Sequence, residues 1–151
     1  MHPTRKALGV LLISMIVEVN SNQRTHREKR MLGIFKFGLM VRCATKRHPF
    51  SYTFYGCWCG IGGGGKIVDE TDRCCYHHDQ CYEDAIRRGD CQYYEWFITN
   101  YSRIGCTGCS LENSRCGKAV CRCDQKAAEC FRRAAFHRKN MYYKLNIFKR
   151  C

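Results

Sequence analysis

Four of the fourteen cysteines limit the fold more than any other feature of this 151-residue chain. Cys74 and Cys81 are seven residues apart, and so are Cys123 and Cys130. Seven residues are about two turns of an α-helix, so each pair lies along one helix face. If the two helices are antiparallel, the first cysteine of each pair can bond to the second of the other. The spacing therefore predicts two long helices held side by side by two disulfides.

The segments around these cysteines set approximate helix boundaries. Residues 69–72 offer N-cap candidates, and the first helix is expected to start at Thr71 or Asp72 and to stop at Gly89. The second is expected over about 118–140. Between them, residues 92–99 are aromatic and β-branched, which predicts a short two-stranded hairpin before Cys116, of unreadable register.

The cysteine content and the N-terminus both indicate an oxidising, extracellular compartment. Cysteines are even in number and dense, as in a disulfide framework. Basic residues precede an apolar run over 7–17, which is too short to cross a bilayer, where a helix needs about 20 residues. We interpret 1–20 as a signal peptide, 21–30 as a propeptide ending in a multibasic tract, and 31–151 as one secreted domain. A buried first helix and a solvated charge run are the alternatives.

The chain after residue 30 is basic. Residues 1–30 hold six of the 26 Lys and Arg and two of the 13 Asp and Glu, which leaves 20 against 11 and a formal charge of +9. Nucleic acid and anionic membranes both suit such a surface. Secretion favours a membrane or another extracellular polyanion.

One histidine lies midway between the two disulfides that are expected to join the helices. His78 follows Cys74 by four residues and precedes Tyr82 by four, so all three face the second helix. Asp124 comes to a similar level on that helix. A histidine oriented by a carboxylate is the arrangement of a general base. A core histidine satisfied by a structural aspartate is the alternative.

Residues 55–65 form a glycine-rich loop that suits calcium better than phosphate or zinc. A phosphate-binding loop needs Ser or Thr after Lys66, and this chain has Ile67. Zinc would need the nearby cysteines with His78, and oxidised cysteines do not bind it. Calcium prefers six to eight oxygens, which loop carbonyls and the Asp79 carboxylate could supply.

Three spaced motifs carry a family resemblance. They are Y-G-C-x-C-G-x-G-G-x-G at 55–65, D-x-C-C-x-x-H-D-x-C-Y at 72–82 and C-x-C-D at 121–124. Together they resemble the secreted phospholipase A2 family over nearly all of the chain after residue 30. The resemblance implies a mainly α, disulfide-rich fold with an N-terminal helix, a calcium-binding loop, two long antiparallel disulfide-linked helices and a short two-stranded β-hairpin.

The resemblance also implies a metal site. Calcium would be held by the carbonyls of Trp58, Gly60 and Gly62 and by the carboxylate of Asp79. The N–H of Gly60 would be a second donor to the oxyanion that forms during ester hydrolysis.

The catalytic residues follow from the same motifs. By the resemblance, His78 is the general base, Asp124 orients it, and Tyr82 donates a hydrogen bond to that carboxylate. The family usually has a second tyrosine at Asp124. Ile98 falls near its place, and Tyr101 is a candidate if the chain shifts locally.

The resemblance pairs all fourteen cysteines. Cys106 is only three residues before Cys109, so its pairing departs from the usual spacing. The implied bridges are Cys43–Cys106, Cys57–Cys151, Cys59–Cys75, Cys74–Cys130, Cys81–Cys123, Cys91–Cys116 and Cys109–Cys121.

The implied reaction is hydrolysis of the sn-2 ester of a glycerophospholipid to a lysophospholipid and a fatty acid. The expected partner is an anionic phospholipid surface, met by a monomer that does not bind nucleic acid. An apolar opening helix would line the acyl channel, insert at the interface or pack in the core. It comprises Met31, Leu32, Ile34, Phe35, Phe37, Leu39, Met40 and Val41.

A group of basic residues in the last third of the chain could also contact anionic lipid. The alternative is that these residues form an ordinary solvated face. The members of the group are Arg132, Arg133, Arg138, Lys139 and Lys144. Two other functions explain part of the sequence. A non-catalytic phospholipase-like protein would bind a membrane or receptor, and a metal-free antimicrobial or polyanion-binding module would use only charge and cysteines. Neither gives a reason for the glycine loop together with the histidine–aspartate pair.

Overall fold

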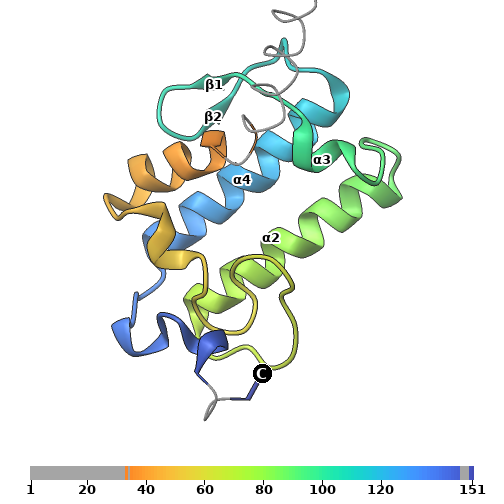
Figure 1. The fold of residues 1–151 in the computed structure, drawn as a ribbon. Coiled ribbons are helices and arrows are strands. Elements are labelled where there is room, and N and C mark those ends of the chain that lie inside the picture. Colours follow the sequence, from red (N-terminus) through yellow and green to blue (C-terminus); the bar gives the residue numbers. More distant parts are fainter. Residues whose placement is uncertain (1–32, 34, 147–149) are drawn as a thin grey trace, which may run out of the picture.

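The structure of the protein is a computed structural model that describes residues 33, 35–146 and 150–151. The predicted signal peptide, propeptide and domain start at Met31 lie outside the described residues and stay predictions. The elements, shown in Figure 1, are a helix over 35–45, η1 (Pro49–Tyr52), α2 (Glu70–Arg87), α3 (Glu95–Ile98), β1 (Arg103–Ile104), β2 (Gly108–Cys109), α4 (Arg115–Arg133), η2 (Arg138–Asn140) and η3 (Tyr143–Leu145).

The predicted helix pair is confirmed. Helices α2 and α4 lie side by side (Figure 1) and are joined by the two disulfides that the seven-residue spacing predicted. The Cα atoms are 5.7 Å apart across Cys74–Cys130 and 5.6 Å apart across Cys81–Cys123. Both distances are ordinary for a disulfide. Ala127 and Ala128 of α4 are buried in the core, where their small side chains occupy little volume.

Helix α2 starts one residue before the expected range. The side chain of Asp69 accepts a hydrogen bond from the backbone N–H of Asp72 at 2.9 Å and so caps the helix. Ser114 caps α4 in the same way, accepting from the N–H of Gly117 at 3.0 Å.

The predicted end of the second helix is wrong. Helix α4 stops at Arg133 rather than near residue 140, because Ala134 adopts an extended conformation with ψ of 141°. The following residues bond back to the start of α2. The hydroxyl of Thr71 donates to the carbonyl of Ala135 at 2.9 Å, and the Asn140 amide donates to the Asp69 carboxylate at 2.7 Å. A continued helix would carry these groups away from their partners.

The predicted hairpin is present, but not in the residues that indicated it. Strands β1 and β2 pair antiparallel, with Ile104 opposite Gly108. The segment 92–99 instead contains the short helix α3. Local hydrogen bonds close this segment into a helical turn in spite of the β propensity of its aromatic residues. The N–H of Gln92 donates to the Glu95 carboxylate at 3.0 Å, and the N–H of Thr99 donates to the Glu95 carbonyl at 2.8 Å.

The N-terminal helix is apolar on opposite faces, as expected. Met40 and Val41 are buried in the core, whereas Phe35 and Leu39 are 58% and 51% exposed. Within the described residues, no helix is long and apolar enough to cross a bilayer.

All seven implied disulfides are formed, including Cys43–Cys106. They join segments that are between 12 and 94 residues apart in sequence. The framework therefore ties the N-terminal helix, the glycine loop, the hairpin and the C-terminus to the α2–α4 pair.

Replacing Cys81 and Cys123 together by alanine should lower the free energy of unfolding by about 3 kcal/mol. Because the Cys74–Cys130 bridge remains, the loop that the lost bridge closes in the unfolded chain spans about 15 residues rather than the 42 that separate the two cysteines. Replacing Cys109 and Cys121, which are 12 residues apart, should cost about as much. Denaturant unfolding of both variants measures the losses. Unchanged stability of the Cys81 and Cys123 variant would contradict this account of the helix pair.

Candidate active site

His78 and Asp124 face each other between the clamped helices. The Nε2 atom of His78 is 2.7 Å from Oδ1 of Asp124, and the aspartate is fully buried. A carboxylate only accepts hydrogen bonds, so Nε2 carries a proton. In the neutral form of the ring, Nδ1 then keeps the free lone pair and is the atom that can accept a proton.

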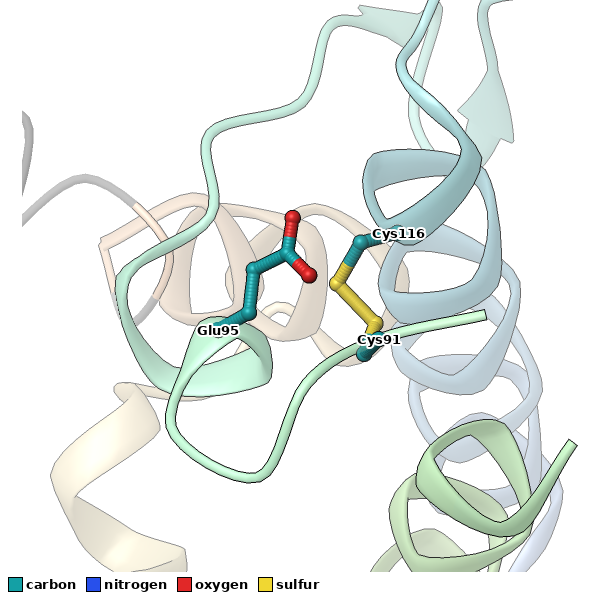
Figure 2. A group of neighbouring side chains, drawn as sticks. All are labelled: Cys91, Glu95 and Cys116. Atoms are coloured by element: carbon teal, nitrogen blue, oxygen red, sulfur yellow. A yellow bond between two sulfur atoms is a disulfide. The ribbon is translucent and has the colours of Figure 1, made fainter. Parts of the chain in front are cut away.

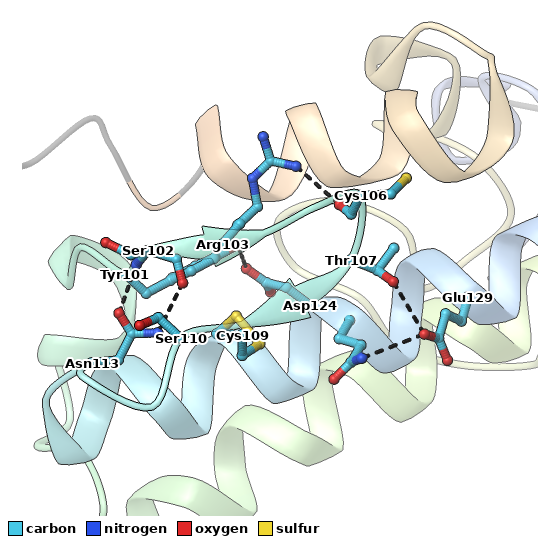
Figure 3. The surroundings of a disulfide bond; sticks show 12 residues. Tyr101, Ser102, Arg103, Cys106, Thr107, Cys109, Ser110, Asn113, Asp124 and Glu129 are labelled. Carbon is cyan, nitrogen blue, oxygen red and sulfur yellow. Dashed lines mark hydrogen bonds between the residues drawn. A yellow bond between two sulfur atoms is a disulfide. The ribbon is translucent and has the colours of Figure 1, made fainter.

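Two tyrosines complete the surroundings of Asp124. Tyr82 donates to Oδ1, and Tyr101 donates to Oδ2 at 2.5 Å; Figure 3 shows Tyr101 reaching α4 from just before the hairpin. Burial, followed by the charge of Asp124, raises the pKa of both phenols, so they stay protonated donors. Of the two candidates for the second tyrosine position, the structure brings Tyr101 to the carboxylate.

Aromatic rings hold the other sides of this cluster. Phe37 of the N-terminal helix stacks on the His78 ring, with centroids 4.4 Å apart. Trp96 of α3 packs on Tyr82 at 4.9 Å. In the sequence analysis Phe37 was only one of several apolar residues of the opening helix, and no sequence signal distinguished Trp96.

The glycine loop needs its glycines for conformation and for space. Gly60 has φ of 88°, and a Cβ there would lie 1.9 Å from the carbonyl oxygen of Thr53. At Gly63 a Cβ would lie 2.7 Å from the Trp58 carbonyl oxygen and 2.8 Å from Oδ2 of Asp79. Those two oxygens are thus within 5.5 Å of each other across the glycine.

That upper bound is close to the largest separation that two ligands of one calcium ion can have. Calcium binds oxygens at about 2.3–2.6 Å, so two of its ligands can be up to about 5 Å apart. The close approach of a loop carbonyl to the Asp79 carboxylate places two of the four predicted ligand groups together. Gly60 and Gly62, whose carbonyls are the other two, lie in the same loop, and both have positive φ.

Partial burial disfavours the charged form of the Asp79 carboxylate. Desolvation raises its pKa to about 6, against the opposing effect of His78 and Lys144. A bound cation would offset this cost by favouring the charged form.

Asp72 holds the loop on α2, a role that sequence reasoning missed. Its fully buried carboxylate accepts from the N–H groups of Cys57 at 3.1 Å, Trp58 at 2.7 Å and Val68 at 3.0 Å. In the sequence it looked like one of several helix-start residues. Its acceptor bonds fix the backbone on both sides of the loop.

A second cluster has the residue types of a metal site but not the chemistry. Cys91, Glu95 and Cys116 gather beside α4, and Figure 2 shows the two sulfurs bonded to each other. A disulfide offers no thiolate, so only the Glu95 carboxylate could bind a cation. We assign no metal to this cluster.

Comparison with known proteins agrees with the geometry. A sequence model of the family described as phospholipase A2 matches residues 34–141. The chain belongs to the phospholipase A2 family. It is 44% identical to phospholipase A2 A2-actitoxin-Cgg2a of Condylactis gigantea over 76% of this chain and 99% of that protein. It is 40% identical to a basic phospholipase A2 of Micrurus corallinus over 74% and 77%.

Membership makes this chain an enzyme of phospholipid hydrolysis. The matched region contains the histidine, both aspartates, the glycine loop and Tyr101. Another relative, phospholipase A2 A2-hormotoxin-Apt1a of Adamsia palliata, is 42% identical over 76% of each chain. The roles of individual residues remain to be assigned from the geometry.

Replacing Asp72 by asparagine should destabilise the protein by about 2–3 kcal/mol, because an amide replaces a charged acceptor and turns a donor toward backbone N–H groups. Thermal or denaturant unfolding measures this loss. The control is Asp90→Asn, whose carboxylate bonds only to exposed arginine side chains and should change stability little. Equal stability of the Asp72 variant and wild type would contradict the anchoring role.

Proposed function

We propose that this chain is a secreted, calcium-dependent enzyme that hydrolyses the sn-2 ester of glycerophospholipids to a lysophospholipid and a fatty acid. One observation supports this above all: His78, oriented through Nε2 by Asp124, is the residue next to Asp79, whose carboxylate meets the glycine loop. A base and a metal carboxylate are thus adjacent on one helix. A general base can activate water for attack on an ester, and a metal bound beside it can polarise the ester carbonyl.

His78 acts as the general base. Its Nδ1 accepts a proton from a water molecule, and the hydroxide equivalent attacks the ester carbonyl. The imidazolium that forms is stabilised by the Asp124 carboxylate through Nε2. Tyr82 and Tyr101 keep that carboxylate in place through their hydrogen bonds. No side-chain nucleophile is needed, and the proton later returns to the leaving alkoxide.

The loop and Asp79 hold the metal. The ligands are the carbonyls of Trp58, Gly60 and Gly62 and the carboxylate of Asp79. Calcium bound there would polarise the ester carbonyl and bind the substrate phosphate. The N–H of Gly60 donates a further hydrogen bond to the developing oxyanion, and such a donor is worth about 10²–10³ in rate.

The exposed apolar residues give the enzyme its membrane face. Phe35 and Leu39 on the N-terminal helix are more than half exposed, and Ile61 in the glycine loop is 94% exposed. These groups can insert at a lipid interface, while exposed basic residues near the end of α4, such as Arg132 and Arg133, attract anionic headgroups. We propose an extracellular monomer that docks on anionic phospholipid and not on nucleic acid.

Fatty-acid release from mixed phosphatidylglycerol and phosphatidylcholine vesicles tests this function. Wild-type protein starting at Met31 should release fatty acid with calcium and lose the activity in chelator. His78→Gln should lower the rate by about 10²–10⁴-fold, because the base is removed. Asp79→Asn should lower it at least as far, because the metal carboxylate is lost.

Two matched variants on α2 serve as controls. His77→Gln alters an exposed neighbouring histidine, and Asp84→Asn alters a carboxylate that pairs with exposed Arg87. Both should keep the wild-type rate. No release from correctly oxidised, calcium-binding wild-type protein would contradict the proposal and favour the non-catalytic lipid-binding alternative.

A further inference from the structure

A basic pocket of about 440 Å³ lies where the chain just after the N-terminal helix meets the segment after α4. Its walls consist of two arginines, a serine, a phenylalanine and a methionine, which are Arg47, Ser51, Phe136, Arg138 and Met141. Pockets that bind small molecules commonly have volumes of about 300–1,000 Å³. Among the described residues, no acidic side chain lines this pocket, so it presents positive charge to a ligand.

The guanidinium group of Arg47 is held on an aromatic ring. Its Cζ atom lies 4.8 Å from the centre of the Phe136 ring. That ring packs in turn on Tyr52 and Tyr55, with centroids 5.2 and 5.1 Å away. A guanidinium stacked on a ring keeps its N–H groups available at the edge, where they can donate two parallel hydrogen bonds to an oxyanion. Arg47 is therefore oriented before a ligand binds.

The backbone around Arg138 is also fixed. Arg138 is the first residue of η2, and hydrogen bonds hold the residues on both sides of it. The N–H of His137 donates to the Tyr55 hydroxyl at 3.0 Å, and the N–H of Gly56 donates to the carbonyl of Asn140 at 3.0 Å. The second arginine of the pocket thus extends from a backbone position that is set by the core.

The protein does not neutralise either arginine of the pocket. Within the part of the chain that the structure describes, the arginines in ion pairs with carboxylates are Arg73, Arg87, Arg88 and Arg115. Two positive charges that line one pocket without a carboxylate repel each other. An anion bound in the pocket would offset that repulsion and occupy the hydrogen-bond donors.

The shape and lining of the pocket suit a phosphate ester better than a bare ion. The pocket is much larger than a phosphate ion, and Met141 and Phe136 offer an apolar wall to the carbon atoms of an ester. Phe50, which precedes Ser51 in η1, is 74% exposed. A lipid layer would accept this ring, whereas a sulfated sugar offers it no apolar surroundings. A phospholipid headgroup therefore fits these features best.

The pocket is separate from the candidate active site, because none of its residues belongs to the catalytic cluster or to the glycine loop. A row of contacting rings connects the two places. Phe37 stacks on His78 at 4.4 Å and lies 6.5 Å from Phe131, which stacks on Tyr52 at 4.5 Å. Tyr52 then packs on Phe136. A lipid in the pocket would thus be a second phospholipid, distinct from the one that is hydrolysed.

We infer that this pocket binds the phosphate group of an anionic phospholipid through the guanidinium groups of Arg47 and Arg138 and the hydroxyl of Ser51. The inference rests on the proposed docking to anionic phospholipid, but it needs neither calcium nor hydrolysis. A headgroup held there, beside the exposed ring of Phe50, would fix the orientation of the protein on the membrane.

Binding to vesicles of ether-linked phosphatidylglycerol and phosphatidylcholine, measured in chelator, tests the inference, because these lipids have no ester to hydrolyse. Arg47→Gln and Arg138→Gln should each weaken binding about tenfold, since each variant loses a charge-assisted hydrogen bond to phosphate. Arg47→Lys keeps the charge but loses the planar, stacked donor. It should therefore also weaken binding, by about threefold.

Arg122 provides the matched controls, because it is an exposed arginine of α4 that does not line the pocket. Arg122→Gln removes the same charge and should weaken binding less than about threefold, since a distant exposed charge is screened by salt. Arg122→Lys should bind as wild type does. Should a glutamine variant fail to fold, the comparison of Arg47→Lys with Arg122→Lys still separates a specific site from net charge.

The possible outcomes distinguish the inference from the proposed function. Larger losses in the pocket variants than in the controls support the inference. Equal losses at Arg47, Arg138 and Arg122 would overturn it in favour of attraction by net charge alone. Pocket variants that lose affinity for a sulfated oligosaccharide but not for the vesicles would also overturn it. If wild-type protein does not bind the vesicles, the proposed docking to anionic phospholipid itself fails.

Discussion

The contact between α2 and α4 holds His78 against Asp124, and the rest of the candidate site is arranged around that pair. The Cys74–Cys130 and Cys81–Cys123 disulfides set the register of the two helices, and His78 lies between them. With the register fixed, the imidazole and Asp124 meet at 2.7 Å without any loop having to place them. A base held by crosslinked helices is preorganised, so no ordering has to occur when substrate binds.

The glycine loop depends on the same helix pair through different forces. Its backbone is held by the buried carboxylate of Asp72, and its edge is covered by the C-terminal segment that the Cys57–Cys151 disulfide anchors. Asp79 projects from α2 toward the loop carbonyls. Two consecutive residues of α2 therefore provide the proposed base, His78, which faces α4, and the proposed metal ligand, Asp79, which faces the loop.

Local spacing predicted more of this arrangement than composition did. Cysteines seven residues apart report the helical repeat, so the clamp and the level of His78 followed from the sequence. The end of α4 did not, because it depends on the Thr71 hydroxyl bonding to Ala135, 64 residues away. The prediction of a strand over 92–99 was wrong because hydrogen bonds within the segment, between Gln92, Glu95 and Thr99, form a helical turn there. The anchoring of the loop by Asp72 arises only from tertiary packing.

The central claim is that the loop and α2 build one calcium site beside the oriented histidine. A crystal structure of the protein grown with calcium tests it most directly. The account predicts an ion about 2.3–2.6 Å from the Asp79 carboxylate and from the carbonyl oxygens of Trp58, Gly60 and Gly62, with the His78–Asp124 bond unchanged. Calcium bound elsewhere, with this loop and Asp79 left without an ion, would contradict the account.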